Sequence, residues 1–396
     1  MKILIFNSFY YPNIFGGAEI SIKLLAEAFA LERMEPVVVT ISNADRIDSV
    51  NKVKVYNLHH RNIYWYADSK KKSKIYKPFW YLINLFNPGL YYRISRIIDM
   101  EKPDIINTQN LIGFPVFIWR MFKRKKVPVV HTVRDYFLIC WRSSMFSRGN
   151  NCLNQCFSCK LYSYLYKLNS RNVDAVVSIS DHILKKHLRF DFFCRSRRYV
   201  IGNPVICDPK IKPGKHNKKK LVFGFVGAIT KEKGIELVLD VFLKFFKDIH
   251  LNIYGRSQDR LYMEDLKDKY ISDNIKFMGF KKQEEIYNEI DVLVVPSLWD
   301  EPFGRVIIEA NSYGIPVIAS NRGGIPEIIE DNRNGFIFDP DNTSELIDVI
   351  KRISSYPGIT EKMSDDCIGM AKQYSANKIS SDYIEIYNDI INNYKK

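Results

Sequence analysis

The chain has 396 residues, of which 46% are hydrophobic, enough for two ordinary cores in domains of roughly 200 residues each. This composition excludes a disordered chain and a fibrous protein. Lysine and arginine number 59 against 44 aspartates and glutamates, which gives a formal charge of +15. Nucleic acid, an anionic membrane surface and a phosphorylated ligand are all compatible with this charge, and charge alone does not choose among them.

Residues 1–6 resemble the start of a signal peptide, but the apolar run ends at Asn7 and is too short for one. We predict a first buried strand there instead. The uncharged stretch at residues 78–92 is interrupted at Asn87-Pro88-Gly89, and no stretch of the sequence supplies the ~20 apolar residues that span a bilayer. We therefore expect a cytoplasmic location with reduced thiols.

Short apolar strands alternate with helical patterns in both halves of the chain, which is typical of parallel sheets with helices on both faces. In the first half we predict strands at residues 2–8, 36–41, 53–58, 104–108, 127–132 and 174–179. In the second half we predict strands at residues 221–226, 250–254, 275–280, 292–295, 316–319 and 336–338. This alternation predicts an α/β protein with two Rossmann-like domains.

The domain boundaries follow from a change in composition. Residues 204–220 are polar and rich in lysine, which predicts a linker between a first domain at residues 1–203 and a second at residues 221–373. Residues 374–396 have the pattern of a helix.

The loop after the first predicted strand contains Gly16-Gly17 and precedes a helix near residues 18–34. Backbone amides in such a loop can contact a phosphate, and a plain turn is an equally good interpretation. The sequence contains no Gly-x-Gly-x-x-Gly motif, which argues against a dinucleotide oxidoreductase.

Residues 59–96 interleave basic and aromatic side chains. The cations include Arg61, Lys71, Lys72, Lys77, Arg93 and Arg96, and the aromatic residues include Trp65, Tyr76, Phe79, Trp80 and Phe86. This mixture favours an anionic membrane interface, supported by a second basic run at residues 123–126. An amphipathic surface helix beside a solvated loop is the alternative. No recognition motif for nucleic acid is present, so we expect no nucleic-acid partner.

Four cysteines lie close together in the sequence, at Cys140, Cys152, Cys156 and Cys159. The last three have the short spacings that zinc sites use, but the spacing from Cys140 is long and only one Cys-x2-Cys pair is present. A structural zinc site and four unliganded thiols are therefore both open interpretations. Disulfides are less compatible with a cytoplasmic protein.

The most informative stretch is residues 296–310, which follows an apolar strand and opens a helix. Glu301 stands in a turn with proline and glycine. Glu309 lies about one turn inside a helix that is expected to begin near Arg305 and to stop at Gly314. Both carboxylates are expected to face one pocket. The first amides of that helix, around Gly304, form the positive end of a helix dipole and suit a phosphate, so the pattern indicates a phosphorylated sugar.

This Glu-x7-Glu motif contains Pro-Phe-Gly and is followed by Gly323-Gly324-Ile325-Pro326-Glu327. Together these segments resemble the signature of the family-4 retaining glycosyltransferases of GT-B fold, and the resemblance covers most of the chain. It implies two Rossmann-like domains whose parallel sheets face each other across a cleft. It also implies that residues 374–396 cross back onto the first domain.

The resemblance assigns roles to residues of the motif. Glu309 would hold the ribose hydroxyls of a nucleotide diphosphate sugar, which suits a carboxylate that accepts from two neighbouring hydroxyls. Glu301 would hold the hydroxyls of the donor sugar and act in catalysis. The amides of Phe303, Gly304 and Arg305 would contact sugar and phosphate.

The same resemblance assigns roles outside the motif. Lys233 would pair with the donor diphosphate, Arg256 would border the base and Gly17 would line the cleft. His131 is predicted to end a buried strand at the carboxyl edge of the first sheet. There it would contact the donor sugar as a second catalytic residue.

The chain departs from the family pattern at Ala228, where the family usually has an arginine. One expected phosphate contact is therefore missing, and Lys231, Arg256 or Arg305 are candidates to replace it. Without a replacement, the loss of one charge-assisted hydrogen bond costs about 1.5–3 kcal/mol. The departure concerns donor affinity and not the fold.

Asp339-Pro340-Asp341 has the form that metal-dependent transferases use for a divalent cation. It lies between a predicted strand and a predicted helix, where aspartates form turns and caps. We therefore expect catalysis without a cofactor, with Lys233 and a helix N-terminus stabilising the charge of the leaving group.

The resemblance implies a retaining glycosyltransferase of the hexosyltransferase type. Its expected acceptor is a saccharide, in particular one linked to polyprenyl diphosphate, in cell-surface polysaccharide or O-antigen biosynthesis. The expected location is the inner face of the cytoplasmic membrane. A weakened GT-B protein that binds nucleotide sugars or serves as a scaffold is one alternative, and a GT-B epimerase is another.

Overall fold

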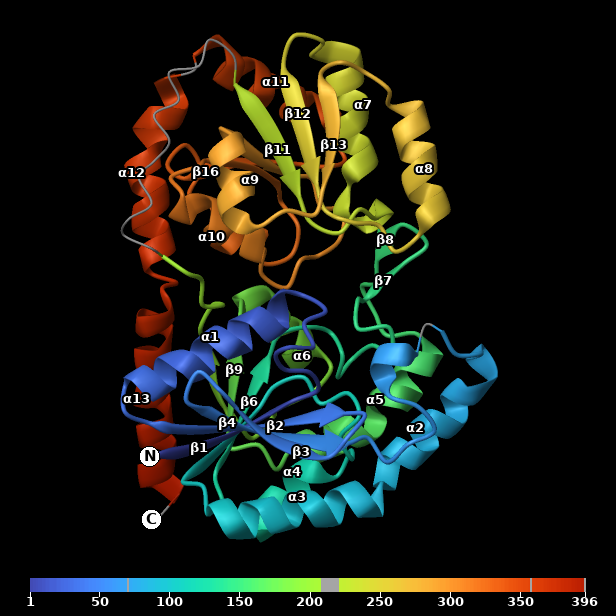
Figure 1. Ribbon diagram of the computed structural model, residues 1–396, viewed down its shortest axis with the longest axis vertical. Coiled ribbons are helices and arrows are strands. Elements are labelled where there is room, and N and C mark those ends of the chain that lie inside the picture. Colours follow the sequence, from blue (N-terminus) through green and yellow to red (C-terminus); the bar gives the residue numbers. More distant parts are fainter. Residues whose placement is uncertain (70, 208–220, 357, 395–396) are drawn as a thin grey trace. The chain divides into compact units, whose positions relative to one another are not determined.

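The structure is a computed structural model that describes residues 1–69, 71–207, 221–356 and 358–394 (Figure 1). The chain divides into two compact units. Unit 1 consists of Met1–Met145, Asn154–Pro204 and Ala376–Lys396, and unit 2 consists of Phe146–Leu153 and Val205–Ser375. Most of the predicted linker, residues 208–220, lies outside the described residues.

Unit 1 is built on an eight-stranded sheet with the strand order β10-β9-β6-β5-β1-β2-β4-β3. Its strands are β1 (Lys2–Asn7), β2 (Glu35–Ser42), β3 (Arg46–Val50), β4 (Val53–His59), β5 (Ile105–Thr108), β6 (Val129–Val133), β9 (Ala175–Ser178) and β10 (Arg197–Val200). Strand β3 is antiparallel to β4, and the other neighbours are parallel. The six strands predicted for this half are present with small shifts at their ends. The edge strands β3 and β10 were not predicted.

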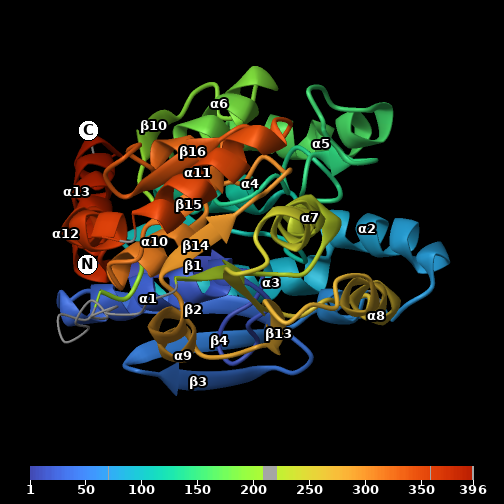
Figure 2. The same cartoon turned by 90° about the horizontal axis from the view of Figure 1, so that it is seen from above.

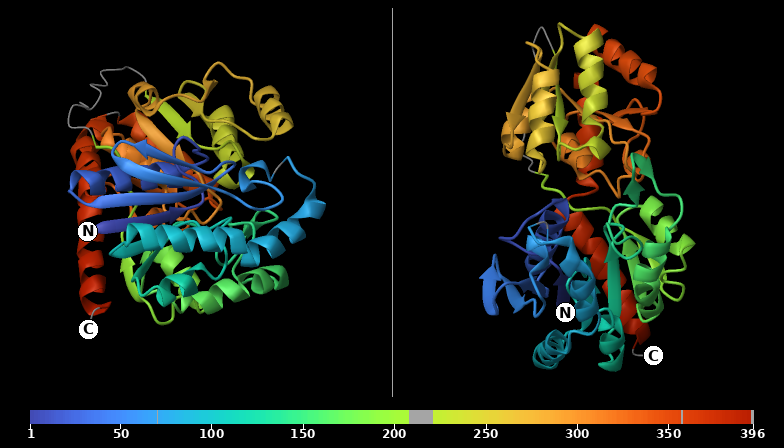
Figure 3. Two further views of the ribbon diagram at one scale, coloured as in Figure 1. Left: turned by 60° about the horizontal axis from the view of Figure 1, so that its bottom comes forward. Right: turned by 90° about the vertical axis from the view of Figure 1, so that its right-hand side faces the viewer.

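Helices flank this sheet (Figure 3). They are α1 (Gly17–Leu31), α2 (Lys77–Phe86), α3 (Pro88–Glu101), α4 (Ile118–Arg124), α5 (Phe157–Ser170), α6 (Asp181–Arg189) and α13 (Ala376–Tyr394), with the short 3-10 helices η1 (Tyr66–Asp68) and η2 (Lys74–Tyr76). The C-terminal helix α13 crosses α1 and packs against it (Figure 1). Its Tyr383 and Tyr387 rings are buried at 6.3 and 5.8 Å from the Phe29 ring of α1, measured between centroids, and this packing joins the C-terminus to unit 1.

Unit 2 has a six-stranded, fully parallel sheet with the order β13-β12-β11-β14-β15-β16. Its strands are β11 (Val222–Val226), β12 (His250–Tyr254), β13 (Ile275–Gly279), β14 (Val292–Val295), β15 (Val317–Ser320) and β16 (Gly335–Phe338). Its helices are η3 (Lys231–Lys233), α7 (Ile235–Phe245), α8 (Arg260–Lys269), α9 (Gln283–Glu289), α10 (Arg305–Ser312), η4 (Ile325–Glu327), α11 (Thr343–Ser355) and α12 (Gly358–Lys372). The six strands predicted for this half are confirmed, and both sheets have the α/β organisation that the alternating pattern predicted.

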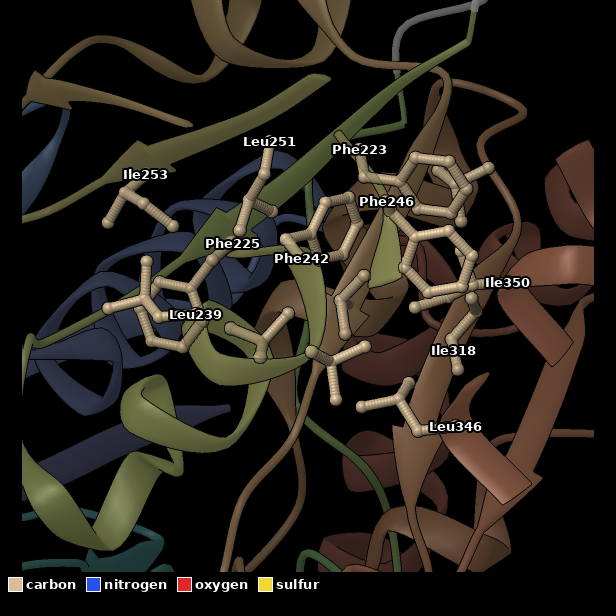
Figure 4. Packing of buried hydrophobic residues seen from close by; sticks show 14 of the residues in the cluster. Phe223, Phe225, Leu239, Phe242, Phe246, Leu251, Ile253, Ile318, Leu346 and Ile350 are labelled. Atoms are coloured by element: carbon tan, nitrogen blue, oxygen red, sulfur yellow. The ribbon is translucent and has the colours of Figure 1, made fainter. Parts of the chain in front are cut away.

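The core of unit 2 holds the segment between β11 and α7 in place. Figure 4 shows Phe223 and Phe225 of β11 among apolar side chains from α7 and the neighbouring strands. The Phe223 and Phe242 rings are fully buried with 5.5 Å between their centroids, in an edge-to-face arrangement. Because β11 and α7 pack directly on each other, the loop that joins them has little freedom.

A short hairpin connects two parts of unit 1 but belongs to unit 2. Its strands are β7 (Phe146–Ser147) and β8 (Asn150–Asn151), which pair antiparallel. The turn residues Arg148 and Gly149 have φ angles of +53° and +80°, the left-handed backbone that a type I′ turn requires. The sequence analysis placed this segment in the first domain, and that assignment is wrong, because Phe146–Leu153 packs with unit 2.

Candidate active site

In unit 2 the strand order reverses at β11 and β14, which are neighbours in the sheet although β12 and β13 lie between them in the sequence. Ligands of open parallel sheets bind beyond the carboxyl ends of the strands at such a switch point. The segment after β11 contains Lys233, and the segment after β14 contains Glu301. The fold therefore brings these two residues to the same point of the sheet.

Glu301 is buried and held by two neighbours. Only 7% of it is exposed. Its Oε1 forms an ion pair with Lys233 Nζ and accepts a hydrogen bond of 3.1 Å from Ser297 Oγ. The Lys233 ammonium also lies 5.0 Å from the centroid of the Trp299 ring. A cation and a carboxylate thus stand side by side in defined positions at the switch point.

Two glycines allow the backbone to pack closely around Glu301. Gly234 has a φ of +70°, and a Cβ at this position would lie 1.8 Å from the carbonyl oxygen of Pro296. Gly323 has a φ of +63°, and its Cβ would lie 2.2 Å from the carbonyl oxygen of Glu301. Any side chain at either position would displace the segment that carries Glu301.

Helix α10 supplies the second carboxylate. The helix begins at Arg305, as predicted, after Gly304 with a φ of +100°. Glu309 is 8% exposed, and its Oε1 accepts a hydrogen bond of 2.5 Å from Arg305 Nε. The Tyr287 hydroxyl lies 3.4 Å from Oε2. Burial, reinforced by the charge of Glu309, raises the pKa of Tyr287 well above its ordinary value, so Tyr287 remains a hydrogen-bond donor.

The residue between these carboxylates, Phe303, contributes only its backbone to the site. Its side chain is 3% exposed and packs against the Tyr374 ring, with 5.5 Å between the centroids. This anchors the turn that precedes α10 and leaves its amides as the groups that a ligand can reach.

The three candidates to replace the arginine missing at Ala228 differ in their surroundings. The Arg305 guanidinium is occupied by Glu309. Lys231 and Arg256 are exposed, and their cationic groups lie 5.7 and 4.8 Å from the centroids of the Tyr262 and Phe280 rings. The carbonyl of Arg256 accepts a hydrogen bond of 3.1 Å from the amide of Ile229, next to Ala228. The backbone of Arg256 therefore lies beside the segment with Ala228, the position at which the cation is missing.

His131 does not lie where the sequence analysis placed it. It is the central residue of β6 and not its end, and it is 2% exposed. Its ring stacks on Phe193 with 5.4 Å between centroids and meets the edge of Trp119 at 5.0 Å, and its Nδ1 lies 2.9 Å from Thr108 Oγ1. Burial lowers the pKa of His131 to about 3. This is a neutral core histidine of unit 1, and its contact with a donor sugar stays a prediction.

The residue that follows β6 is Arg134, which the sequence analysis did not select. It is 7% exposed, its Nε donates a hydrogen bond of 2.5 Å to Gln109 Oε1, and its Nη1 hydrogen-bonds Asn203 Oδ1. The signal that was missed is the length of the strand, which continues through Val133. Arg134 therefore takes the position at the carboxyl edge that His131 was expected to occupy.

The glycine-rich loop lies at the switch point of unit 1, between the ends of β1 and β5. Gly17 is the first residue of α1. The amide of Gly16 donates a hydrogen bond of 2.8 Å to Glu19 Oε2, and burial, together with the nearby charge of Asp135, raises the pKa of Glu19. A carboxylate already caps this amide, so the geometry at Gly16 favours the turn over the phosphate contact.

Comparison with known proteins identifies the family. The model of the glycosyl transferases group 1 matches residues 208–373, and the model named Glycosyltransferase Family 4 matches residues 15–208. An uncharacterized 42.6 kDa protein in the cps region of Klebsiella pneumoniae is 33% identical over 334 residues, which cover 83% of this chain and 87% of the relative. The chain belongs to glycosyltransferase family 4.

Further relatives agree with this assignment. The uncharacterized glycosyltransferase MJ1607 of Methanocaldococcus jannaschii is 31% identical over 408 residues, which cover 98% of both chains. Among solved structures, sucrose-phosphate synthase from Thermosynechococcus elongatus has a TM-score of 0.77 at 18% identity and covers 98% of both chains. HepE from Anabaena, solved in complex with UDP, has a TM-score of 0.71 at 18% identity and covers 98% of this glycosyltransferase and 100% of HepE. Both structures have the GT-B fold of this glycosyltransferase.

Three of the four cysteines of this glycosyltransferase lie side by side, because the Cys159 thiol contacts those of Cys140 and Cys156. Cys152 belongs to unit 2 with the hairpin, whereas Cys140, Cys156 and Cys159 belong to unit 1. Burial, together with the neighbouring thiols of Cys140 and Cys156, raises the pKa of Cys159 to about 12. In the part of the chain that the structure describes, no three histidine, cysteine or acidic side chains gather in a way that could hold a metal ion.

Asp339 and Asp341 form a turn that is closed by an arginine. Asp339 Oδ1 accepts a hydrogen bond of 3.1 Å from the amide of Asp341. Arg322 Nη2 lies 2.5 Å from Asp341 Oδ2 and 3.4 Å from Asp339 Oδ1. These are the turn contacts that the position between a strand and a helix predicted.

No helix among the described residues is both long enough and apolar enough to cross a bilayer.

Proposed function

We propose that this glycosyltransferase moves a sugar from a nucleotide diphosphate sugar to a saccharide acceptor with retention at the anomeric carbon, in the assembly of a cell-surface polysaccharide. The observation that carries the donor assignment is the pairing of Lys233 with Glu301 at the switch point of unit 2, followed by Glu309 on α10. Two buried carboxylates and a lysine beside a helix N-terminus suit the hydroxyls and the phosphates of such a donor.

The carboxylates have different partners and therefore different proposed roles. Glu309 accepts from Arg305 through one oxygen and has its other oxygen near Tyr287, in a site whose charge is balanced. We assign it the ribose hydroxyls. Glu301 stands beside Lys233, and we assign it the hydroxyls of the transferred sugar. Each carboxylate would exchange or share a protein contact for hydroxyl hydrogen bonds.

Lys233 and the first amides of α10 are proposed to hold the diphosphate. When the bond between sugar and phosphate breaks, negative charge grows on the departing phosphate oxygen, and a fixed ammonium beside it stabilises that charge. We propose a front-face reaction in which the departing phosphate accepts the proton of the acceptor hydroxyl. His131 has no part in this scheme because it is enclosed by Trp119 and Phe193.

HepE was solved with UDP and with UDP-glucose, which makes uracil the first base to test for this glycosyltransferase. We would record thermal unfolding with UDP, GDP and ADP and with their sugar conjugates. A ligand at 100 times its Kd adds about 2.7 kcal/mol to the free energy of unfolding, so one nucleotide series should raise the midpoint by several degrees.

The variants in this screen have matched controls. Glu309→Gln should remove most of the nucleotide shift, whereas Glu264→Gln should not. Glu264 forms the same kind of pair, with an arginine four residues earlier, on the exposed helix α8. Equal shifts in both variants would contradict the ribose assignment. A nucleotide shift without any sugar transfer would favour the alternative of a nucleotide-sugar-binding module.

The acceptor proposal rests on helix α2 of unit 1, whose outer face exposes apolar side chains to solvent. Helix α2 turns Trp80 and Asn84 toward the unit, where both are buried. The opposite face carries Phe79, Leu82 and Phe86, which are 60%, 63% and 61% exposed. These positions follow the spacing of one helical stripe. In Figure 2, α2 lies at the outer edge of unit 1, away from α1.

Cations stand next to this apolar stripe. Lys71 and Lys72 are exposed in the segment that leads into α2, and Ile75 and Tyr76 extend the stripe at its start. An apolar helix face beside basic side chains fits a membrane interface with anionic lipid. We therefore propose peripheral binding to such a membrane and an acceptor saccharide that is linked to a lipid, such as a polyprenyl diphosphate.

Liposome flotation tests the membrane proposal. The wild-type protein should float with vesicles that contain phosphatidylglycerol and less with vesicles of phosphatidylcholine alone. Replacing Phe79 and Leu82 by Gln should abolish flotation, whereas Leu261→Gln should not, although Leu261 is 77% exposed. Equal flotation of all variants would remove the support for this surface. Dimerisation that disappears in the α2 variant would assign the stripe to a second copy instead.

A further inference from the structure

The hairpin β7–β8 contacts the segment that carries Glu301 through one side chain. Asn151 Nδ2 donates a hydrogen bond of 2.9 Å to the carbonyl oxygen of Leu298. Its Oδ1 accepts a hydrogen bond of 2.8 Å from the amide of Asp300. A single carboxamide therefore binds a carbonyl and an amide two residues apart, as the backbone of a neighbouring strand would do.

These hydrogen bonds complement contacts from another element. The amides of Leu298 and Trp299 donate to the carbonyl of Glu232, at 3.0 and 3.2 Å, and Glu232 belongs to η3 together with Lys233. The segment before Glu301 is neither helix nor strand. It is thus held through its amides by η3 and through the carbonyl of Leu298 and the amide of Asp300 by the hairpin.

The hairpin is built to present Asn151. In the pairing register, Phe146 lies opposite Asn151 and Ser147 lies opposite Asn150. The neighbouring Asn150 has a different role, because its Nδ2 donates to the carbonyl of Arg148 within the turn. Of these two adjacent asparagines, Asn150 therefore contributes to the turn of the hairpin, and Asn151 contributes the contact with the Glu301 segment.

We propose that Asn151 is a positioning residue for sugar transfer, which sets the place of Glu301 by binding the backbone at Leu298 and Asp300. This inference rests on the proposed function of Glu301 as the group that holds the donor sugar. Lys233 and Glu309 are assigned to the nucleotide part of the donor. The loss of Asn151 should therefore impair the binding of the donor sugar by Glu301 and leave the affinity for the nucleotide unchanged.

The test compares Asn151→Ala, Asn151→Asp and the matched control Asn150→Ala. Donor kcat/KM is measured with the nucleotide sugar that the thermal screen selects, and Kd is measured with the corresponding nucleoside diphosphate. Asn151→Ala should lower kcat/KM at least 10-fold while Kd stays within about 2-fold, because each lost hydrogen bond contributes to the position of Glu301. Asn151→Asp keeps the acceptor for the amide of Asp300 and should recover part of the loss.

A second readout does not depend on turnover. Hydrogen exchange of a peptide that covers residues 296–303 should be faster in Asn151→Ala than in the wild type, and unchanged in Asn150→Ala. If exchange and kcat/KM are the same in the two alanine variants, the inference is overturned. If the wild type transfers no sugar, the proposed function fails, and the exchange rates still decide whether Asn151 holds the segment.

Discussion

The ion pair between Lys233 and Glu301 combines two groups that a donor would separate. In the proposed donor complex, the diphosphate would compete with the carboxylate for Lys233, and the carboxylate would then have an oxygen to offer to sugar hydroxyls. This single contact would link donor binding to the preparation of Glu301.

Glu301→Gln tests this link. The amide has the same shape but no charge, so the diphosphate loses its competitor for Lys233. The nucleoside diphosphate should bind at least as tightly as it binds to the wild type, whereas sugar transfer should fall at least 10-fold. Calorimetric Kd values and initial rates would show this. Weaker nucleotide binding with unchanged transfer would contradict both assigned roles.

His131 should behave as a core residue. His131→Ala removes a ring that packs between Trp119 and Phe193 and leaves Thr108 without this partner. We expect the free energy of unfolding to fall by about 2–4 kcal/mol. Urea unfolding would measure it, and the nucleotide Kd of the folded variant should not change. A large rise in Kd with normal stability would restore a role in donor binding.

At the scale of single elements, helix α2 has one face that is buried in unit 1 and an opposite face that is exposed. Trp80 is 3% exposed, and its indole Nε1 donates a hydrogen bond of 2.9 Å to the carbonyl of Tyr64. Trp80→Ala should therefore cost about 3–5 kcal/mol of stability. Leu82→Gln, on the opposite face, should change stability by less than about 0.5 kcal/mol. Similar losses in urea unfolding would show that the outer face is also packed.

Helix α3 is fastened to the sheet by Glu101, which hydrogen-bonds Lys2, Lys54 and Tyr56. Burial alone would raise the pKa of Glu101, but the hydrogen bonds from these residues outweigh it and lower the pKa from 4.5 to about 2. Because the folded pKa is depressed, the stabilisation is present above pH 4.5 and is lost as the pH falls toward 2.

Glu101→Gln should therefore destabilise the protein more at pH 6 than at pH 3. Urea unfolding of both proteins at the two pH values would measure the difference. An equal loss of stability at both pH values would show that the ionised carboxylate is not what fastens α3.

The elements that the sequence predicted best are those with continuous apolar runs. All central strands were found, because burial on both faces gives them such runs. Strands β3 and β10 were missed because they lie at sheet edges and carry charged residues such as Arg46, Asp48 and Arg197. Strand β6 ends at Val133, one residue later than predicted, and Arg134 follows it, whereas His131 lies at its centre.

At the scale of the whole molecule, unit 2 is built from two separate segments of the chain, Phe146–Leu153 and Val205–Ser375. The hairpin Phe146–Leu153 comes from within the first half of the sequence and packs with unit 2. No periodicity marks a hairpin with strands of only two residues each, and its contact with Leu298 and Asp300 spans about 150 positions. The motif around Glu301 was readable because it is local, whereas the side chain that holds it in place was not.

The central claim is that a nucleotide diphosphate sugar binds at the switch point of unit 2. A crystal structure with the nucleoside diphosphate from the thermal screen tests it most directly. The account predicts phosphate oxygens within hydrogen-bonding distance of Lys233 Nζ and of the first amides of α10, and ribose hydroxyls on Glu309. A nucleotide bound elsewhere, with the Lys233–Glu301 pair and Glu309 untouched, would contradict it.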